Sequence, residues 1–302
     1  MIRIGSRGSQ LALWQAEHVA GLLRERGHEV EIEVIKTTGD RMQEVTFAEV
    51  GSKGMFTLEI EEALAAGRVD LAVHSLKDLP TELPAAFVLG ATPARVDPRD
   101  VLVSKDFASL QALPESARVG TSSLRRRAQL RALRPDIEFI EFRGNVDTRL
   151  RKLGEGKAEA IVLAAAGLDR LEKTEWIRER IAVDVVCPAA GQGALGIEIR
   201  ANDPRVSEIV AFLDDPATRF AVTAERVALA ALGGGCQVPI GVHCRPRASG
   251  GFEILGVVAD PDGSRVLRSF ASGDDADELG RVVAVDLLQQ GASELFEGIG
   301  TH

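Results

Sequence analysis

Cysteine is scarce in this chain, which has three cysteines in 302 residues and no C-x-x-C pair. An odd number this small cannot build a disulfide scaffold, and a structural zinc site needs closely spaced pairs. Long apolar segments are missing too, because the longest run, residues 160–168, is far too short to span a membrane. The first residues lack the apolar core of a signal peptide. We therefore expect a cytoplasmic protein that has no membrane partner.

The chain also lacks an overall basic charge, since 36 Lys and Arg face 45 Asp and Glu, a net charge of −9. This balance argues against a nucleic-acid partner, which would need a basic face. Residues 118–151 reverse the balance with nine Arg and no Lys against four acids, a local charge of +5. A positive field inside an acidic chain suggests a small anionic ligand, although a solvated basic face would give the same count. Neither phosphate-binding motif, G-x-x-x-x-G-K-[ST] or G-x-G-x-x-G, is present, so a nucleotide is not implied.

The order of strand-like and helix-like segments predicts two α/β units with mostly parallel strands. The first unit is expected at residues 1–95, completed by a returning strand within 194–213. The second is expected at residues 99–189. Two such units resemble the bilobal architecture of periplasmic binding proteins. The predicted segments are strands at 2–5, 29–37, 70–74, 87–91, 101–104, 118–121, 137–140, 160–163 and 196–199, and helices at 10–26, 56–66, 123–133, 146–153 and 165–171.

The last third has a different pattern and predicts a small C-terminal α+β domain at residues 216–302. A helix rich in Ala is expected at 217–232, ending at three consecutive glycines. Three strand-like runs follow at 238–244, 253–258 and 265–272, and a helix at 275–290 closes the pattern.

Three turns from strand to helix combine hydroxyl groups with arginine: residues 6–9 (SRGS), 120–126 (GTSSLRR) and 143–149 (RGNVDTR). Amide groups at a helix N-terminus, with Arg beside them, suit a carboxylate or a phosphate. Such turns lie at the carboxyl ends of parallel strands, where open α/β sheets bind ligands. Each turn taken alone is equally an ordinary helix cap with an exposed basic neighbour.

Two further positions could carry chemistry. Asp78 follows Lys77 at the end of a buried strand, where an ionised carboxylate can stabilise a developing cation; a surface ion pair explains the same two residues. A Ser-His-Asp triad is not expected, because adjacent strand residues such as His74 and Ser75 point to opposite faces. Cys236 follows Gly233-Gly234-Gly235, which suggests an accessible nucleophile or attachment point rather than a core residue. Cys187 and Cys244 are expected to be core residues.

Taken together, the chain resembles the porphobilinogen deaminase family over nearly its whole length and in the family's order. The stretches around AVHSLKD and GGCQVPIG are the most specific of the resemblance. The matching segments are RIGSRGSQLALWQA (3–16), GSKGMF (51–56), DLAVHSLKDLP (70–80), DPRD (97–100), VGTSSLRRR (119–127), FRGNVDTRL (142–150), LAAAGLDRL (163–171), PAAGQGALGIE (188–198), TAER (223–226) and GGGCQVPIG (233–241).

The resemblance implies a transferase of tetrapyrrole (heme-type) biosynthesis. Four porphobilinogen units would be added in turn to a dipyrromethane cofactor, each with loss of ammonia, and water would release hydroxymethylbilane. It implies a cytoplasmic monomer, a thioether from Cys236 to the cofactor, and Asp78 as the catalytic residue. The positions that it assigns to cofactor and substrate binding are Arg7, Ser9, Lys53, Phe56, Ser75, Lys77, Thr121, Ser122, Ser123, Arg125, Arg126, Arg143, Arg149, Arg170 and Gln192.

The arginines and the carboxylate found in the sequence agree with the chemistry of a pyrrole substrate. Each pyrrole bears an acetate and a propionate, which arginine binds in a bidentate manner. Loss of ammonia leaves an electron-poor pyrrole, which one carboxylate can stabilise. Three positions depart from the family's usual residues: Glu49 stands in place of Lys, Asp147 in place of Gly, and Gly233 in place of Glu.

Two other functions fit parts of the sequence. A noncatalytic bilobal binding protein for a small anion would explain the paired units and the Arg-rich turns, but not Cys236 on its glycine loop. A hydrolase using Cys236 with His243 would need the chain to fold back, because seven strand residues span up to roughly 23 Å.

Overall fold

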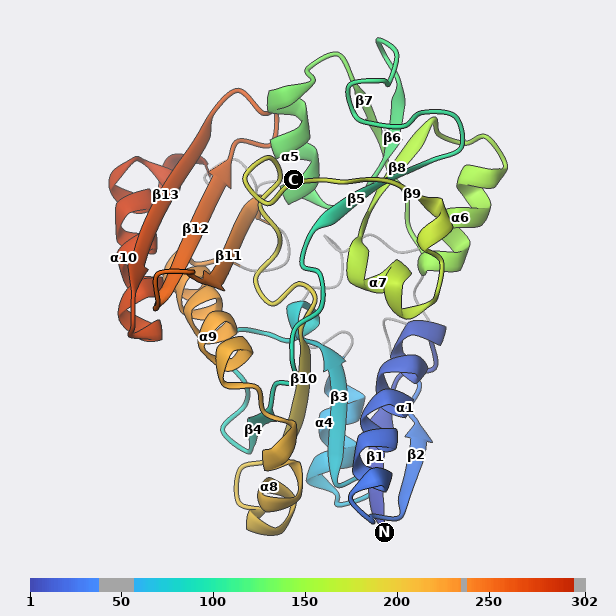
Figure 1. Ribbon diagram of the computed structural model, residues 1–302, viewed down its shortest axis with the longest axis vertical. Helices are drawn as coiled ribbons and strands as arrows, with labels where there is room; N and C mark the ends of the chain where they lie inside the picture. Colours follow the sequence, from blue (N-terminus) through green and yellow to red (C-terminus); the bar gives the residue numbers. More distant parts are fainter. Residues whose placement is uncertain (38–56, 235–237, 296–302) are drawn as a thin grey trace. The chain divides into compact units, whose positions relative to one another are not determined.

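The structure is a computed structural model that describes residues 1–37, 57–234 and 238–295 (Figure 1). Its chain forms two compact units, Met1–Val96 with Ala194–Arg219, and Asp97–Gly193 with Phe220–His302. The sequence-based division into three domains stays a prediction. Four positions singled out above lie outside the described residues: Glu49, Lys53, Phe56 and Cys236.

The first unit is built on a five-stranded sheet with the order β2-β1-β3-β10-β4. Strands β1, β2 and β3 run parallel, and β10 runs antiparallel to both of its neighbours, β3 and β4. The predicted return of residues 196–199 to this sheet is confirmed. The elements are β1 Ile2–Ser6, α1 Gln10–Glu25, β2 Val30–Val34, α4 Leu58–Ala65, β3 Leu71–Ser75, η1 Leu76–Asp78, β4 Phe87–Ala91, β10 Leu195–Arg200, α8 Pro204–Val210 and η3 Ala211–Leu213.

Helix α1 shows how the local sequence produces this unit. Ser9 accepts a hydrogen bond from the amide of Ala12 and caps the helix, which ends just before Gly27 at φ +84°. Its buried face, with Val19 and Leu23, packs on core residues of the sheet such as Ile4. Each fully buried aliphatic side chain of this kind contributes about 1.5–3 kcal/mol.

The second unit repeats the strand pattern in a sheet with the order β7-β6-β8-β5-β9. Strands β7, β6 and β8 run parallel, and β5 runs antiparallel to both β8 and β9. Four of the five strands in each sheet therefore share one direction, which confirms two α/β lobes with mostly parallel strands. The elements are β5 Asp100–Ser104, β6 Arg118–Gly120, α5 Leu124–Leu133, β7 Glu138–Ile140, α6 Val146–Gly154, β8 Ala160–Ala164, α7 Ala165–Arg170, η2 Thr174–Trp176 and β9 Ile177–Arg180.

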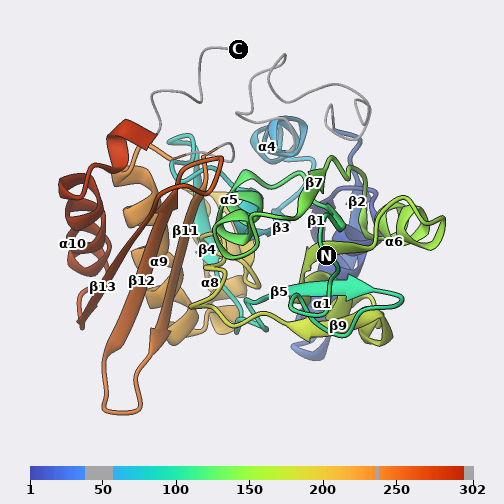
Figure 2. The same cartoon turned by 90° about the horizontal axis from the view of Figure 1, so that it is seen from above.

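The C-terminal elements form the expected small α+β layer. Strands β11 (Ile240–Pro246), β12 (Phe252–Ala259) and β13 (Val266–Gly273) make an antiparallel sheet. Helix α10 (Ala276–Gln289) lies along one face of this sheet (Figure 2), and α9 (Pro216–Ala231) contributes to the same apolar core. A short turn, η4 (Ala292–Leu295), follows α10.

Two elements were not predicted from the sequence, β9 and α8. Strand β9 has the sequence Ile-Arg-Glu-Arg and lies at the edge of its sheet, so three of its four residues are charged and give no apolar pattern. Helix α8 is only seven residues long and buries two of them, Val206 and Val210. The predicted strand at 29–37 is shorter than expected, and it spans Val30–Val34.

The backbone of β11 at Gly241 packs directly against the backbone around Cys187, with no side chain between the two segments. A Cβ at Gly241 would lie 2.6 Å from the carbonyl oxygen of Cys187, while the amide of Val242 donates to the carbonyl of Pro188. We expect Gly241→Ala to lower the free energy of unfolding by about 1–3 kcal/mol, because backbone must move to admit the methyl group. Gly21→Ala in α1 is the control: it has open space and should raise stability by about 0.5–1 kcal/mol. Urea unfolding of both variants checks this, and equal midpoints would contradict the close packing.

Candidate functional site

The first lobe gathers its candidate residues at one edge of its sheet. Strands β1 and β3 are parallel neighbours, so the residues that follow them share an edge. Arg7 follows β1, and the η1 turn with Lys77 and Asp78 follows β3. The Gln15 amide of α1 donates to the Ser75 hydroxyl over 2.8 Å and fixes the end of β3. Lys77 is half-buried and Asp78 is exposed.

A buried ionisable group lies just before this edge. His74 Nε2 is 3.0 Å from Glu198 Oε2 of the antiparallel strand β10, and both side chains are buried. Ser75 is held by Gln15 instead, so His74 and Ser75 have different partners. The sequence analysis did not identify Glu198. Its position between two isoleucines of a predicted strand could have indicated a buried, paired carboxyl.

The second lobe brings three strand ends together. Strand β6 is parallel to β7 on one side and to β8 on the other, with Gly120 opposite Ile140 and Ile161. Thr121 directly follows β6 and stays next to the end of β7, because its amide donates to the carbonyl of Ile140 over 3.0 Å. The turns that begin α5, α6 and α7 therefore start from neighbouring strands. Two of the three predicted Arg-rich turns, residues 120–126 and 143–149, lie among them, and the third, residues 6–9, belongs to the first lobe.

Part of each turn is used as a helix cap. Ser123 caps α5 by accepting from the amide of Arg126 at 3.4 Å, and Asn145 caps α6 by accepting from the amide of Thr148 at 2.9 Å. Ser122 differs, because its buried hydroxyl oxygen has no hydrogen-bond partner among the described residues. A buried hydroxyl without a partner costs free energy, so a polar ligand group beside Ser122 would relieve that cost.

Arg125 and Arg126, at the second and third positions of α5, converge on one carboxylate. Asp100 Oδ2 accepts from Arg125 Nη1 at 2.7 Å, while Asp100 Oδ1 accepts from Arg126 Nε at 2.9 Å and Nη2 at 2.7 Å. Gln192 Nε2 also donates to Asp100 Oδ1, at 2.9 Å. Asp100 is 0 % exposed, and both guanidinium groups are buried. Three residues predicted for ligand binding thus share a carboxylate that sequence reasoning did not select.

The electrostatics of this cluster keep the Asp100 carboxylate ionised. Burial alone would raise the pKa of Asp100, but Arg125 and Arg126 outweigh burial and hold that pKa well below its ordinary value. Burial lowers the pKa of Arg170 to about 10, which still leaves this guanidinium charged at neutral pH. Arg170 Nη2 donates to the carbonyl of Gly193 at 2.8 Å. The second lobe therefore keeps several buried positive charges near its strand ends.

Arg143 and Arg149 are less deeply placed than Arg125 and Arg126. Both are half-buried: Arg143 Nε lies 3.1 Å from Glu141 Oε2, and Arg149 Nε donates to the carbonyl of Gly144 at 2.8 Å. Asp147, a departure from the family's usual glycine, lies in the first turn of α6 and pairs with Lys173. Lys173, which follows α7, thus compensates the extra negative charge in this turn.

Two of the three cysteines are core residues, which confirms their interpretation. Cys187 and Cys244 are buried, and burial raises the pKa of the Cys187 thiol well above its ordinary value. Such thiols are poor nucleophiles. Gly233, after the end of α9, has φ +67°, a conformation that the glutamate usual in the family would adopt only with strain.

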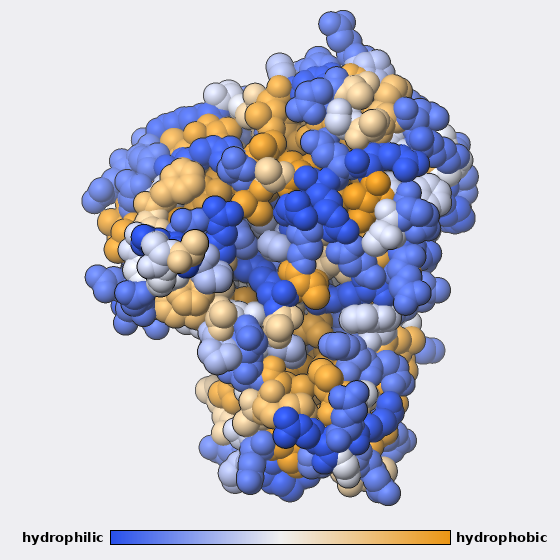
Figure 3. Space-filling model, in the orientation of Figure 1, coloured by the Kyte–Doolittle hydropathy of each residue, from blue (hydrophilic) through white to orange (hydrophobic). Residues whose placement is uncertain are grey.

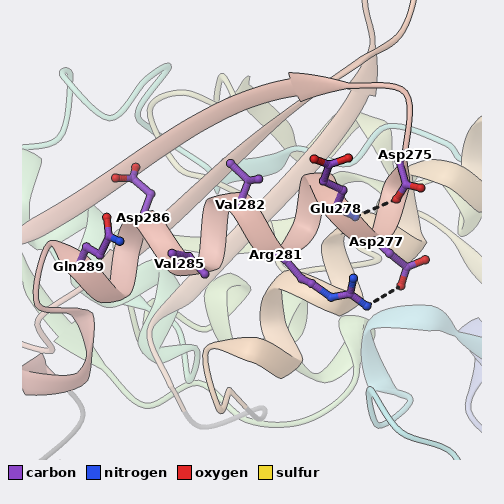
Figure 4. Close-up of a pocket in the computed structure, with 8 residues that line it drawn as sticks. All are labelled: Asp275, Asp277, Glu278, Arg281, Val282, Val285, Asp286 and Gln289. Carbon is purple, nitrogen blue, oxygen red and sulfur yellow. Dashed lines mark hydrogen bonds and ion pairs between the residues drawn. The ribbon is translucent and has the colours of Figure 1, made fainter.

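Other surface features do not contribute to this site. On the face shown in Figure 3, hydrophilic and apolar side chains are interspersed. The pocket in Figure 4 is lined by residues of α10 and the residue before it, where Asp277 pairs with Arg281 and Asp275 caps the helix. None of the predicted site residues lines it. Among the described residues, no three or more His, Cys, Asp or Glu side chains are grouped to hold a metal ion, and no helix is long and apolar enough to cross a membrane.

Comparisons with known proteins agree with this picture. Residues 2–208 match the family described as porphobilinogen deaminase, dipyromethane cofactor binding domain, and residues 219–289 match its C-terminal domain. Porphobilinogen deaminase of Nitratidesulfovibrio vulgaris (strain DP4) is 50% identical over 302 residues, covering 98% of this chain and 96% of that protein. Porphobilinogen deaminase of Roseiflexus sp. (strain RS-1) is 51% identical over 301 residues, covering 98% of each chain.

Solved structures were compared as well. A periplasmic substrate-binding protein of an ABC transporter from Coxiella burnetii has a TM-score of 0.43 and 16% identity, covering 72% of this chain and 94% of that one. A methionine-binding protein has a TM-score of 0.44 and 14% identity, and the match covers 72% of this chain and 91% of that one.

Two α/β lobes whose matched domain binds a dipyrromethane cofactor define a transferase of tetrapyrrole biosynthesis. The chain belongs to the porphobilinogen deaminase family. The alternative of a noncatalytic binding protein is not favoured by these matches.

The buried acid Glu61 of α4 gives a prediction for pH-dependent stability. Burial raises the pKa of Glu61, and the nearby Glu198 carboxylate raises it further. The folded state therefore binds the proton of the Glu61 carboxyl more tightly than the unfolded chain does. The stability that this proton contributes is present at low pH and is lost as pH rises through the pKa of the folded state. We expect Glu61→Gln to be more stable than the wild type at neutral pH, with the difference vanishing below the ordinary value of 4.5.

Urea unfolding from about pH 4 to about pH 8 measures this difference. The exposed neighbour Glu62 provides the matched control, and Glu62→Gln should leave the pH profile of stability unchanged. A Glu61→Gln variant that is less stable at neutral pH than at acidic pH, relative to the wild type, would contradict the prediction.

Proposed function

We propose that this protein joins four porphobilinogen molecules head to tail onto a covalent dipyrromethane cofactor, releases one ammonia at each addition, and hydrolyses the product to hydroxymethylbilane. The observation that carries this proposal is the set of arginines that follow β6 and β7 (Arg125, Arg126, Arg143 and Arg149) or end α7 (Arg170), in a chain of this family. Every pyrrole unit adds two carboxylates, so a growing chain needs many cationic partners.

The residues present fit the cofactor. When bound, dipyrromethane supplies the terminal pyrrole carbon to which the first substrate is joined. The second lobe offers guanidinium groups for its carboxylates and one buried hydroxyl, Ser122, without a described partner. The residues proposed to hold cofactor and substrate are Thr121, Ser122, Ser123, Arg125, Arg126, Arg143, Arg149, Arg170 and Gln192 in the second lobe, Arg7, Ser9, Ser75 and Lys77 in the first, and Lys53 and Phe56 outside the described residues.

Asp78 is the proposed catalytic residue. As the carbon–nitrogen bond of the substrate breaks and ammonia leaves, positive charge develops over the pyrrole ring. An ionised carboxylate within reach of the pyrrole N–H stabilises this charge, and again stabilises the cation formed when the new carbon–carbon bond is made. The exposure of Asp78 at the end of β3, held in place through Ser75 and Gln15, supports this role.

The charge of Asp78 can be tested separately from its shape. We expect Asp78→Asn to fold normally and to release ammonia about 10²–10³-fold more slowly in a single turnover of cofactor-loaded enzyme. Asp78→Glu keeps the charge and should retain more activity than Asp78→Asn. Thermal unfolding serves as the control for folding. An Asn variant as fast as the wild type would reduce Asp78 to an ion-pair partner of Lys77.

Cys236 is the proposed attachment point of the cofactor, because Cys187 and Cys244 are both buried in cores. Intact mass of the purified protein should exceed the sequence mass by two porphobilinogen units less two ammonias. Cys236→Ala should lack this excess and give no pink colour with Ehrlich reagent. Peptide mapping locates the adduct, and finding it on Cys187 or Cys244 would refute the assignment.

We further propose that the protein acts as a cytoplasmic monomer. Many of its exposed large apolar side chains are spread over several elements, for example Val34 on β2, Leu133 at the end of α5 and Phe270 on β13, while α10 carries three: Val282, Val285 and Leu288. Scattered residues of this kind are ordinary on a monomer surface. Light scattering after size-exclusion chromatography measures the oligomeric state directly.

A further inference from the structure

The Asp100 carboxylate is the centre of the buried polar cluster in the second lobe. It accepts four hydrogen bonds of 2.7–2.9 Å: three from Arg125 and Arg126, and one from Gln192. Asp100 begins β5, and its side chain is wholly buried. Asp100 thus directly contacts three residues of the proposed binding site.

The same three side chains also donate to backbone carbonyls. Arg125 Nη1 donates to the carbonyl of Cys187, Arg126 Nη1 to the carbonyl of Val162, and Gln192 Nε2 to the carbonyl of Pro98. Contacts on two sides hold each guanidinium plane in one orientation, which fixes the position of its positive charge for an anionic ligand. The position of each plane therefore depends on Asp100.

Charge gives Asp100 a second effect. Two adjacent buried guanidinium groups repel each other, and burial of each costs free energy. With Asp100 ionised, the three groups carry a net charge of +1 rather than +2. The cluster can then stay buried at the N-terminus of α5 while remaining attractive to an anion.

We propose that Asp100 is a positioning residue, which does not touch the substrate but orients Arg125, Arg126 and Gln192 toward the carboxylates of the cofactor and the growing pyrrole chain. This inference rests on the proposed function. It predicts a loss of anion recognition when Asp100 is changed, with the chemistry at Asp78 left intact. A purely structural ion pair would instead lower stability alone.

The matched control is Asp136, in the same lobe. Asp136 Oδ1 and Oδ2 accept from Arg134 Nε and Nη2 at 2.8 and 2.6 Å, and Arg134 also donates to backbone carbonyls. Asp136 is therefore a bidentate arginine partner that contacts none of the proposed binding residues in the described part of the chain. Asp136→Asn removes a comparable pair without affecting the Asp100 cluster.

The experiment compares the wild type with Asp100→Asn, Asp100→Glu and Asp136→Asn. Each purified protein is incubated with porphobilinogen, and intact mass gives the fraction that carries dipyrromethane. Steady-state rates per loaded enzyme give KM and kcat, and thermal unfolding gives stability. We expect Asp100→Asn to reduce the loaded fraction at least about tenfold and to raise KM at least about tenfold, with kcat within about threefold of the wild type. Asp100→Glu should recover part of both losses, and Asp136→Asn should match the wild type in loading and KM.

Each outcome has one meaning. Folded Asp100 variants with wild-type loading and wild-type KM overturn the inference, even when their melting temperature is lower. If Asp100→Asn does not fold, the folded Asp100→Glu variant decides the question by the same two measurements. A wild-type protein that neither acquires dipyrromethane nor consumes porphobilinogen contradicts the proposed function itself, which separates the two failures.

Discussion

Like charges that are held together need a counter-charge, and the second lobe is arranged around that requirement. Its parallel strands bring several guanidinium groups to one sheet edge, where a polyanionic ligand would need them. Arg125 and Arg126 are adjacent in sequence and buried, which is costly unless a carboxylate lies between them. Asp100 supplies that carboxylate from the first position of β5, which β8 separates from β6 in the sheet. The turn at α5, the start of β5 and the segment around Gln192 are fixed together as a result.

Much of the architecture could be predicted from local sequence because strand and helix patterns are local. The repeated α/β order, the return of β10 and the small C-terminal sheet all followed from apolar periodicity and glycine breaks. Strand β9 could not be found this way, since charged residues dominate an edge strand. Its existence depends on pairing with β5, which is a tertiary property.

The candidate site was predictable in part for the same reason. The Arg-rich turns and the Lys77–Asp78 pair were recognisable because their chemistry is contained in a few consecutive residues. Asp100 and Glu198 were not, because each acquires its importance from a partner at least 25 residues away in sequence. The same holds for the departure at Asp147, whose partner Lys173 lies 26 residues away in sequence. Contacts between residues that are far apart in sequence could not be predicted from local patterns.

The position of β10 in the first sheet has a consequence for biosynthesis. Among the strands of the described residues, β4 is hydrogen-bonded only to β10, which lies more than 100 residues later in the chain. During translation, which proceeds at about 5–20 residues per second, β4 emerges well before its partner exists. All strands of the second sheet, β5 to β9, are made in that interval. The sheet that begins first is therefore completed after the second sheet, and its open edge has to be kept from aggregation until Arg200 has left the ribosome.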